Sequence, residues 1–220
     1  MSRPAPIFLA DATALDFLNT GIAPNGVPVE WIEDGEDLVS WLLAAKLIDA
    51  EVAGIMRRTS LPAELDAVAA QARSLRSWFG EFVHRHRGQD LHENALAELS
   101  PLNQVLERDD AFGSVVRRNA VASSEVHDSC DHHSPFQWQL RRRWREPGAL
   151  IAPVAQAMAE FVCSADFTRV KQCEGPGCVI TFLDKTRAGT RRWCSMAVCG
   201  NRAKQAAHRD RHARGHATNH

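Results

Sequence analysis

Four cysteines close to the C-terminal end are the residues whose types and spacing best define a chemistry. They form two C-x4-C pairs separated by fifteen residues: Cys173 with Cys178, and Cys194 with Cys199. Four thiolates bind Zn²⁺ tetrahedrally and leave no coordination position open for a substrate. The spacing therefore predicts one structural zinc ion that holds a small fold together. The alternative is a set of scattered or disulfide-bonded cysteines, and disulfides need an oxidising compartment.

The residues around the two pairs predict how the backbone brings the sulfurs together. Gly175-Pro176-Gly177 permits a tight turn between the first two cysteines. Residues five apart on a regular helix point about 140° away from each other, so Cys194 must precede the helix that holds Cys199. Ser195 is then the expected N-cap of that helix.

The segment between the pairs is expected to form a short β-hairpin. Residues 179–183 are β-branched and aromatic, and residues 187–190 supply a turn before residues 191–193. Hairpin, cysteine turns and ligand-bearing helix together predict a treble-clef-like zinc finger with four cysteine ligands. Each cysteine pair is two residues longer than the usual C-x2-C of such fingers.

Charge is distributed unevenly along the chain, whose formal net charge is only −1. Residues 168–220 carry 11 Lys and Arg against 3 Asp and Glu, a balance of +8, while residues 1–167 carry 15 against 24, a balance of −9. Four thiolates and one Zn²⁺ would lower the first balance to about +6. A basic module of this kind is typical of proteins that bind phosphates.

A basic helix next to the metal has the right diameter to enter the major groove of DNA. The candidate contacts are Arg187, Arg191 and Arg192 in the hairpin, and Arg202, Lys204, Arg209 and Arg211 on the helix. Seven such contacts would give log affinity against log salt a slope of about −6. One finger alone binds weakly, so we expect a homodimer formed through the N-terminal domain. The alternatives are that these residues neutralise the zinc–thiolate cluster, that the partner is RNA, or that the finger binds another protein.

The rest of the chain is predicted to be helical, which makes the fold mainly α with small β elements. Helices are expected after Asp34, from Asp49 to Met56, from Pro62 to about Gly88, and from Ala149 to Ser164. Alternating apolar and polar residues predict a β-hairpin that pairs residues 115–121 with residues 136–140. These elements form the core that must position the finger.

The loop of that hairpin holds a second group of metal-ligating residue types. They are His127, Cys130, Asp131, His132 and His133. Their spacing matches no standard zinc template, and turns rich in Asp and Ser often hold such residues at the surface. A second metal site and a solvated loop are both compatible with the sequence.

Two parts of the chain resemble known families. Cys199-Gly200-Asn201-Arg202, preceded by residues 192–196 and by Phe182-Leu183-Asp184, resembles the CGNR zinc finger, which is named for this tetrapeptide. Residues 15–20, Leu-Asp-Phe-Leu-Asn-Thr, resemble the opening motif of the ABATE domain, and Pro101-Leu102-Asn103 is similar to a later stretch of it. The resemblance implies an ABATE-like domain over residues 1–168 and a CGNR-type finger over residues 169–220. It also implies a bacterial, stress-induced transcription regulator whose finger binds DNA.

Three polar residues of the opening motif lie on an otherwise apolar helix: Asp16, Asn19 and Thr20. They are candidates for lining a small-molecule effector pocket in the N-terminal domain. In the alternative, Asn19 and Thr20 cap the end of the helix before Gly21, and Asp16 pairs with an arginine.

The zinc-bound end is expected to unfold first on metal loss and to leave the N-terminal core folded.

Composition narrows the class of protein. The chain has 220 residues of which 45% are hydrophobic, enough for a sizeable core, and no apolar run approaches the ~20 residues that span a bilayer. No secretory signal is visible, so we expect a cytoplasmic protein with no membrane partner and with Cys130 and Cys163 as free thiols. No H-E-x-x-H, Gly-rich phosphate loop or G-x-S-x-G motif occurs, so we expect a regulator and not an enzyme.

Overall fold

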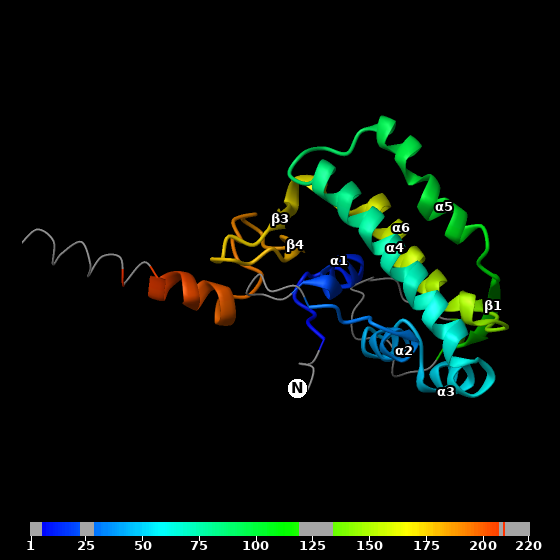
Figure 1. Ribbon diagram of the computed structural model, residues 1–220. Helices are drawn as coiled ribbons and strands as arrows, with labels where there is room; N and C mark the ends of the chain where they lie inside the picture. The colour runs from blue at the N-terminus through cyan, green and yellow to red at the C-terminus, as the bar shows by residue number, and fades with distance from the viewer. Residues whose placement is uncertain (1–5, 23–28, 119–133, 207–208, 210–220) are drawn as a thin grey trace, which may run out of the picture.

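The computed structural model describes residues 6–22, 29–118, 134–206 and 209. The helices are α1 (Thr13–Leu18), α2 (Gly35–Ala44), α3 (Ala50–Thr59), α4 (Pro62–His86), α5 (Ser100–Leu106) and α6 (Ala152–Ser164). Shorter helical turns are η1 (Asn19–Gly21), η2 (Glu93–Leu99), η3 (Pro147–Ile151), η4 (Phe167–Arg169) and η5 (Met196–Gly200). The strands are β1 (Ala111–Arg117), β2 (Phe136–Arg142), β3 (Val170–Gln172) and β4 (Thr181–Leu183). The fold is mainly α with two small antiparallel hairpins, as predicted (Figure 1).

The long helix α4 is the central support of the helical body (Figure 1). Pro62 lies in its first turn, where the missing N–H costs nothing, and Gly88 follows its end with a φ of +78°. Aromatic side chains join it to α6 and to the segment after α6, since the Phe79 ring meets Phe161 and the Phe82 ring meets Phe167. The prediction of a helix from Pro62 to about Gly88 is confirmed.

The other predicted helices also form, with the expected caps. The Asp34 carboxylate accepts the backbone N–H of Asp37 at 2.9 Å and begins α2, and Asp49 accepts that of Val52 at 2.8 Å and begins α3. Each cap pairs one of the donors that a helix start leaves unsatisfied. The expected helix of residues 149–164 is divided, because the 3₁₀ turn η3 precedes α6.

The hairpin of β1 and β2 starts earlier in the chain than predicted. Val115 pairs with Trp138, and the ladder runs from the Ala111–Arg142 pair to the Arg117–Phe136 pair. Charged anchors at the base set this register, because Asp109 receives the Arg142 guanidinium at 2.5 and 2.7 Å. The predicted stretch of residues 115–121 therefore captured only the distal half of β1.

In the finger, the predicted hairpin was wrong in its partner strand. Strand β4 pairs antiparallel with β3, which precedes the first cysteine, and not with residues 191–193. The first cysteine turn is itself the hairpin connection, and the Cys173 N–H donates to the Ile180 carbonyl at 2.9 Å. Residues 191–193 instead contact that turn, with a bond from Glu174 N to Arg192 O at 2.9 Å.

The hydrophobic core runs without a break from the helical body into the finger. Phe17 in α1 and Phe182 in β4 are both buried members of one cluster, which also contains all four finger cysteines. Figure 1 shows β3 and β4 beside α1, while the helix after η5 points away from the body. No helix in the described part of the chain is long and apolar enough to cross a membrane.

Candidate zinc centre

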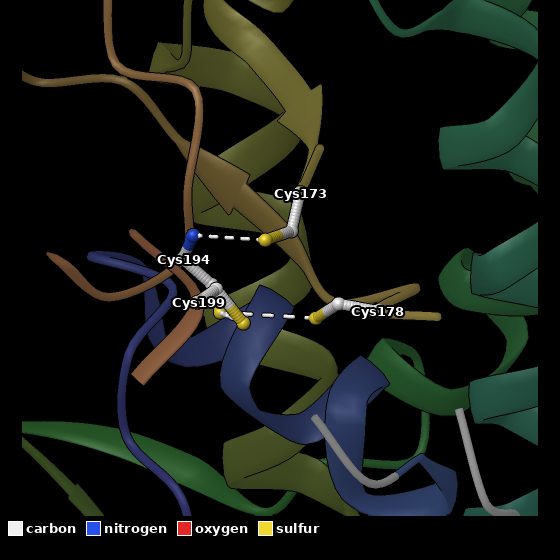
Figure 2. A group of neighbouring side chains, drawn as sticks. All are labelled: Cys173, Cys178, Cys194 and Cys199. Atoms are coloured by element: carbon white, nitrogen blue, oxygen red, sulfur yellow. Dashed lines mark hydrogen bonds between the residues drawn. The ribbon is translucent and has the colours of Figure 1, made fainter. Parts of the chain in front are cut away.

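The four finger cysteines converge on one point, as Figure 2 shows. Their ligand atoms all lie within 4.8 Å of one another, and all four residues are buried. The Cys194 sulfur lies 3.8 Å from that of Cys178 and 3.6 Å from that of Cys199. A tetrahedral site with Zn–S bonds of about 2.3 Å places its sulfurs roughly 3.8 Å apart, whereas a disulfide needs about 2.05 Å. The geometry fits one zinc ion and excludes disulfide pairing among these residues.

The local backbone brings the sulfurs together in the predicted way. Gly177 has a φ of +70° in the first turn, a conformation that disfavours side chains. A Cβ at Gly175 would lie 2.8 Å from the Cys199 Cβ, so the turn must pass that close to the second pair. The Ser195 hydroxyl accepts the N–H of Val198 at 3.3 Å and begins η5, which carries Cys199. The predicted N-cap and the predicted position of Cys194 before the helix are confirmed.

The electrostatics of the four thiols favour a bound cation. Burial would raise the pKa of Cys173, but N–H donation to its sulfur from Cys194 at 3.2 Å and from Gly175 at 3.4 Å brings that pKa below its ordinary value. Burial raises the pKa of Cys178 to about 12, and burial next to that thiol raises the pKa of Cys194 further. Four thiolates this close together need a divalent cation, and Zn²⁺ supplies it as a structural centre without an open position.

A buried carboxylate that the sequence analysis did not single out for a role organises the loop beside the metal site. Asp184 is fully buried and accepts bonds from Lys171 Nζ at 2.8 Å, Thr186 Oγ1 at 2.6 Å and the Arg191 N–H at 2.9 Å. Burial would raise its pKa, but these hydrogen bonds hold the pKa well below its usual range. The signal in the sequence was its place directly after the β-strand residues 181–183.

Most of the predicted DNA-contacting side chains lie on the surface of the finger. Arg187, Arg192, Lys204 and Arg209 are exposed, and Arg202 is half-buried. Arg187 makes no hydrogen bond or ion pair with another described residue, while Arg192 binds Glu174 at 2.6 Å. The helix continues over residues 201–206 and projects from the finger (Figure 1). The predicted contact Arg211 lies outside the described residues.

Arg191, also predicted to contact DNA, is bound by the protein. Its guanidinium donates to the carbonyls of Leu9 at 2.9 Å and Cys194 at 2.6 Å, and it pairs with Asp11. The same group lies 4.3 Å from the ring centroid of Phe182. Arg191 therefore joins the finger to the N-terminal segment, and we assign it a structural role.

The three residues predicted for an effector pocket all make hydrogen bonds within the protein, and two of them, Asp16 and Asn19, do so at this junction. The Asn19 side-chain amide donates to the Thr181 carbonyl at 2.8 Å, and its oxygen accepts the Thr181 N–H at 3.0 Å. Thr20 accepts a bond from Arg76 at 2.7 Å. Asp16 accepts the N–H groups of Leu9 and Ala10, both at 2.9 Å, and does not pair with an arginine as the alternative expected.

This arrangement closes one edge of β4. Asn19 satisfies both backbone groups of Thr181, and the Leu183 N–H donates to the Ala10 carbonyl at 2.9 Å. The opening motif thus works as a clamp between the helical body and the finger. Burial raises the pKa of Asp16 to about 6, against the effect of its two N–H donors. The predicted second metal group, His127 to His133, lies outside the described residues.

Comparison with known families agrees with this architecture. The model described as "CGNR zinc finger" matches residues 169–212, which contain the four clustered cysteines. The ABATE model, described as "Putative stress-induced transcription regulator", matches residues 11–165. A search of curated proteins gives no match. Since the second match covers more than half of the 220 residues, the chain belongs to the ABATE family and carries a CGNR zinc finger at its C-terminal end.

Proposed function

We propose that this protein is a transcription regulator that binds DNA through its zinc finger. The observation that carries the proposal is the position of the basic side chains relative to the metal site. Arg187 and Arg192 are exposed in the segment between the two cysteine pairs, and Lys204 and Arg209 are exposed on the helix that follows Cys199. The structural zinc holds loop and helix in one geometry, so both can approach the same duplex. The proposed role is regulatory and not catalytic, because four thiolates leave zinc no open position.

The structure changes the expected strength of the salt dependence. Arg191 is held within the protein by Leu9, Cys194 and Asp11. Arg192 pairs with Glu174 at the surface, where a phosphate can replace that partner, so six of the seven candidate contacts remain. They are Arg187, Arg192, Arg202, Lys204, Arg209 and Arg211. Six contacts give log affinity against log salt a slope of about −5.

Fluorescence anisotropy of the zinc-loaded full chain with a pool of random duplexes tests the proposal. Arg187→Ala combined with Lys204→Ala should weaken binding at least tenfold at low salt and reduce the slope by about 2. Arg58→Ala is the matched control, because Arg58 is an exposed arginine on α3, outside the finger. The same affinity in the double variant and the wild type would refute the proposed contact surface.

A protein partner is the second candidate, and one observation favours it. Val179, Met196 and Val198 expose between 42% and 51% of their surface around the metal cluster. Apolar side chains at such a position suit a protein surface better than a phosphate backbone. Replacing Met196 and Val198 by serine should leave DNA affinity within about twofold if the finger binds DNA through its basic residues.

A further inference from the structure

One face of the β1–β2 hairpin carries an exposed apolar stripe that the proposed function does not use. We define it by four side chains, Val115, Phe136, Trp138 and Leu140, which are 52% to 71% exposed. The register places them on one face, because Val115 pairs with Trp138 and Gly113 with Leu140. The Trp138 ring lies over Gly113, where an added Cβ would come within 1.6 Å of it. Among the residues that the structure describes, none covers the stripe.

The stripe is large enough to be a binding surface. A large aromatic side chain carries about 150–250 Å², so four side chains this exposed present on the order of 500 Å² of apolar area. Patches of this size on a monomer are often functional. At Leu140 the stripe reaches a cleft of about 700 Å³ whose apolar walls include Leu47, Val52 and Ile55. The cleft also carries charged residues, among them Lys46 and Glu51, so apolar and polar groups both border the end of the stripe next to α3.

We infer that the stripe pairs with the stripe of a second copy of this chain. Its pattern is self-complementary, because Phe136 and Leu140 lie two residues on either side of Trp138. A two-fold axis through Trp138 places Phe136 against the partner's Leu140 and the mouth of its cleft. The pairing buries about 1,000 Å² in total before the cleft walls are counted, which is about the minimum for a biological interface and predicts a weak dimer.

The charge on the hairpin favours a second copy of this chain over a strongly charged partner. The charged residues on this face of the described strands are Arg117 and Arg142, and Arg142 is neutralised by Asp109 at 2.5 Å. The stripe itself carries no charge, so two copies meet without repulsion at the axis. A two-stranded hairpin is also marginally stable in water unless its apolar face is packed. Pairing supplies that packing and goes beyond the proposed function, since it needs no DNA.

Analytical ultracentrifugation of the zinc-loaded full chain, without DNA, measures the pairing. The wild type should sediment as a dimer at twice the 24.4 kDa of the chain. Phe136→Ser combined with Trp138→Ser should weaken dimerisation roughly a hundredfold or more, as expected for a central aromatic pair. Leu96→Ser is the matched control, because Leu96 is 69% exposed outside the stripe and should leave the dimer unchanged.

A charge-exchange experiment tests the two-fold geometry separately from folding. Val115→Lys or Val115→Glu alone places like charges at the axis and should give monomers, while a mixture of the two should give heterodimers. A monomeric wild type at all concentrations overturns the proposal, and so does a dimer that the stripe variants do not weaken. Arg187→Ala with Lys204→Ala should remain dimeric, so a failure of DNA binding is distinguishable from a failure of pairing.

Discussion

The two hairpins of this protein show that strand length does not decide how firmly a sheet is held. The β3–β4 hairpin has strands of three residues, yet Phe182 at its centre is fully buried. The β1–β2 hairpin has strands of seven residues, yet Trp138 at its centre is 71% exposed. The difference lies in what covers each hairpin. The short one is closed by α1, the cysteine cluster and Arg191, while the long one is anchored only at its base within the described part of the chain.

Metal removal should produce the largest difference in stability between the two hairpins. Chelation or Cys199→Ser should unfold the finger, with a loss on the order of 10 kcal/mol of zinc-dependent stability. Because β4 shares its core and its edge with α1, amide protection should also fall in residues 9–19. Protection of β1 and β2 should be retained in hydrogen-exchange mass spectrometry. Cys163→Ser is the control, since this cysteine is exposed and outside the cluster.

This expectation revises the one drawn from the sequence, in which metal loss would leave the whole N-terminal core intact. Unchanged protection of residues 9–19 in the chelated protein would restore the earlier expectation of two independent modules. Loss of protection in β1 and β2 to the same extent would instead show that the chain unfolds as one cooperative unit.

Truncating the central aromatic residue of each hairpin sharpens the same contrast. Phe182→Ala should cost about 3–5 kcal/mol of unfolding free energy, because it leaves a cavity in a packed core. Trp138→Ala should change the unfolding free energy by about 1 kcal/mol or less in dilute protein, where its ring faces solvent and packs mainly on Gly113. Urea titrations at low protein concentration measure both. Equal costs would show that the stripe is covered within the monomer.

Asn19→Ala tests the clamp that closes the edge of β4. The substitution removes two hydrogen bonds and leaves the buried N–H and C=O of Thr181 without partners, at a cost of about 2–4 kcal/mol. The thermal midpoint should fall accordingly, with zinc still bound at one equivalent. Asn103→Ala is a control for asparagine loss, since Asn103 is exposed on α5. A midpoint within about 1 °C of the wild type would show that Asn19 does not stabilise the edge of β4.

Substitution of Asp16 should act through the pH dependence of stability and leave the fold unchanged. Burial raises its pKa from 3.8 to about 6 in the folded state, so the unfolded chain releases this proton first as pH rises. The stability that protonated Asp16 contributes to the folded state is therefore fully present below pH 3.8 and is lost as pH rises through about 6. Asp16→Asn keeps an oxygen for the Leu9 and Ala10 N–H groups and should flatten this fall between about pH 4 and 7. The same pH profile in both proteins would contradict the raised pKa.

Local sequence signals predicted the zinc site better than they predicted how the finger is attached to the helical body. Two C-x4-C pairs, a Gly-Pro-Gly turn and a serine N-cap are short-range features, and the structure reproduces each of them. The same holds for the caps at Asp34 and Asp49, which depend on residues three positions away. The partner strand of β4 was mispredicted because residues 170–172 and 191–193 are both plausible strands at hairpin distance. Pairing was decided by which of them continues the cysteine turn.

Composition and spacing by themselves determined the mainly helical class, the four-sulfur centre and the basic character of the finger. Only the tertiary structure decided the roles of Asn19 and Arg191, because their partners at Thr181 and Leu9 are 162 and 182 residues away. A polar side chain on an apolar helix looks the same in sequence whether it meets a ligand or a backbone edge. The two cases differ in how deeply the side chain is buried and in which distant group it bonds, and both are decided only when the core folds.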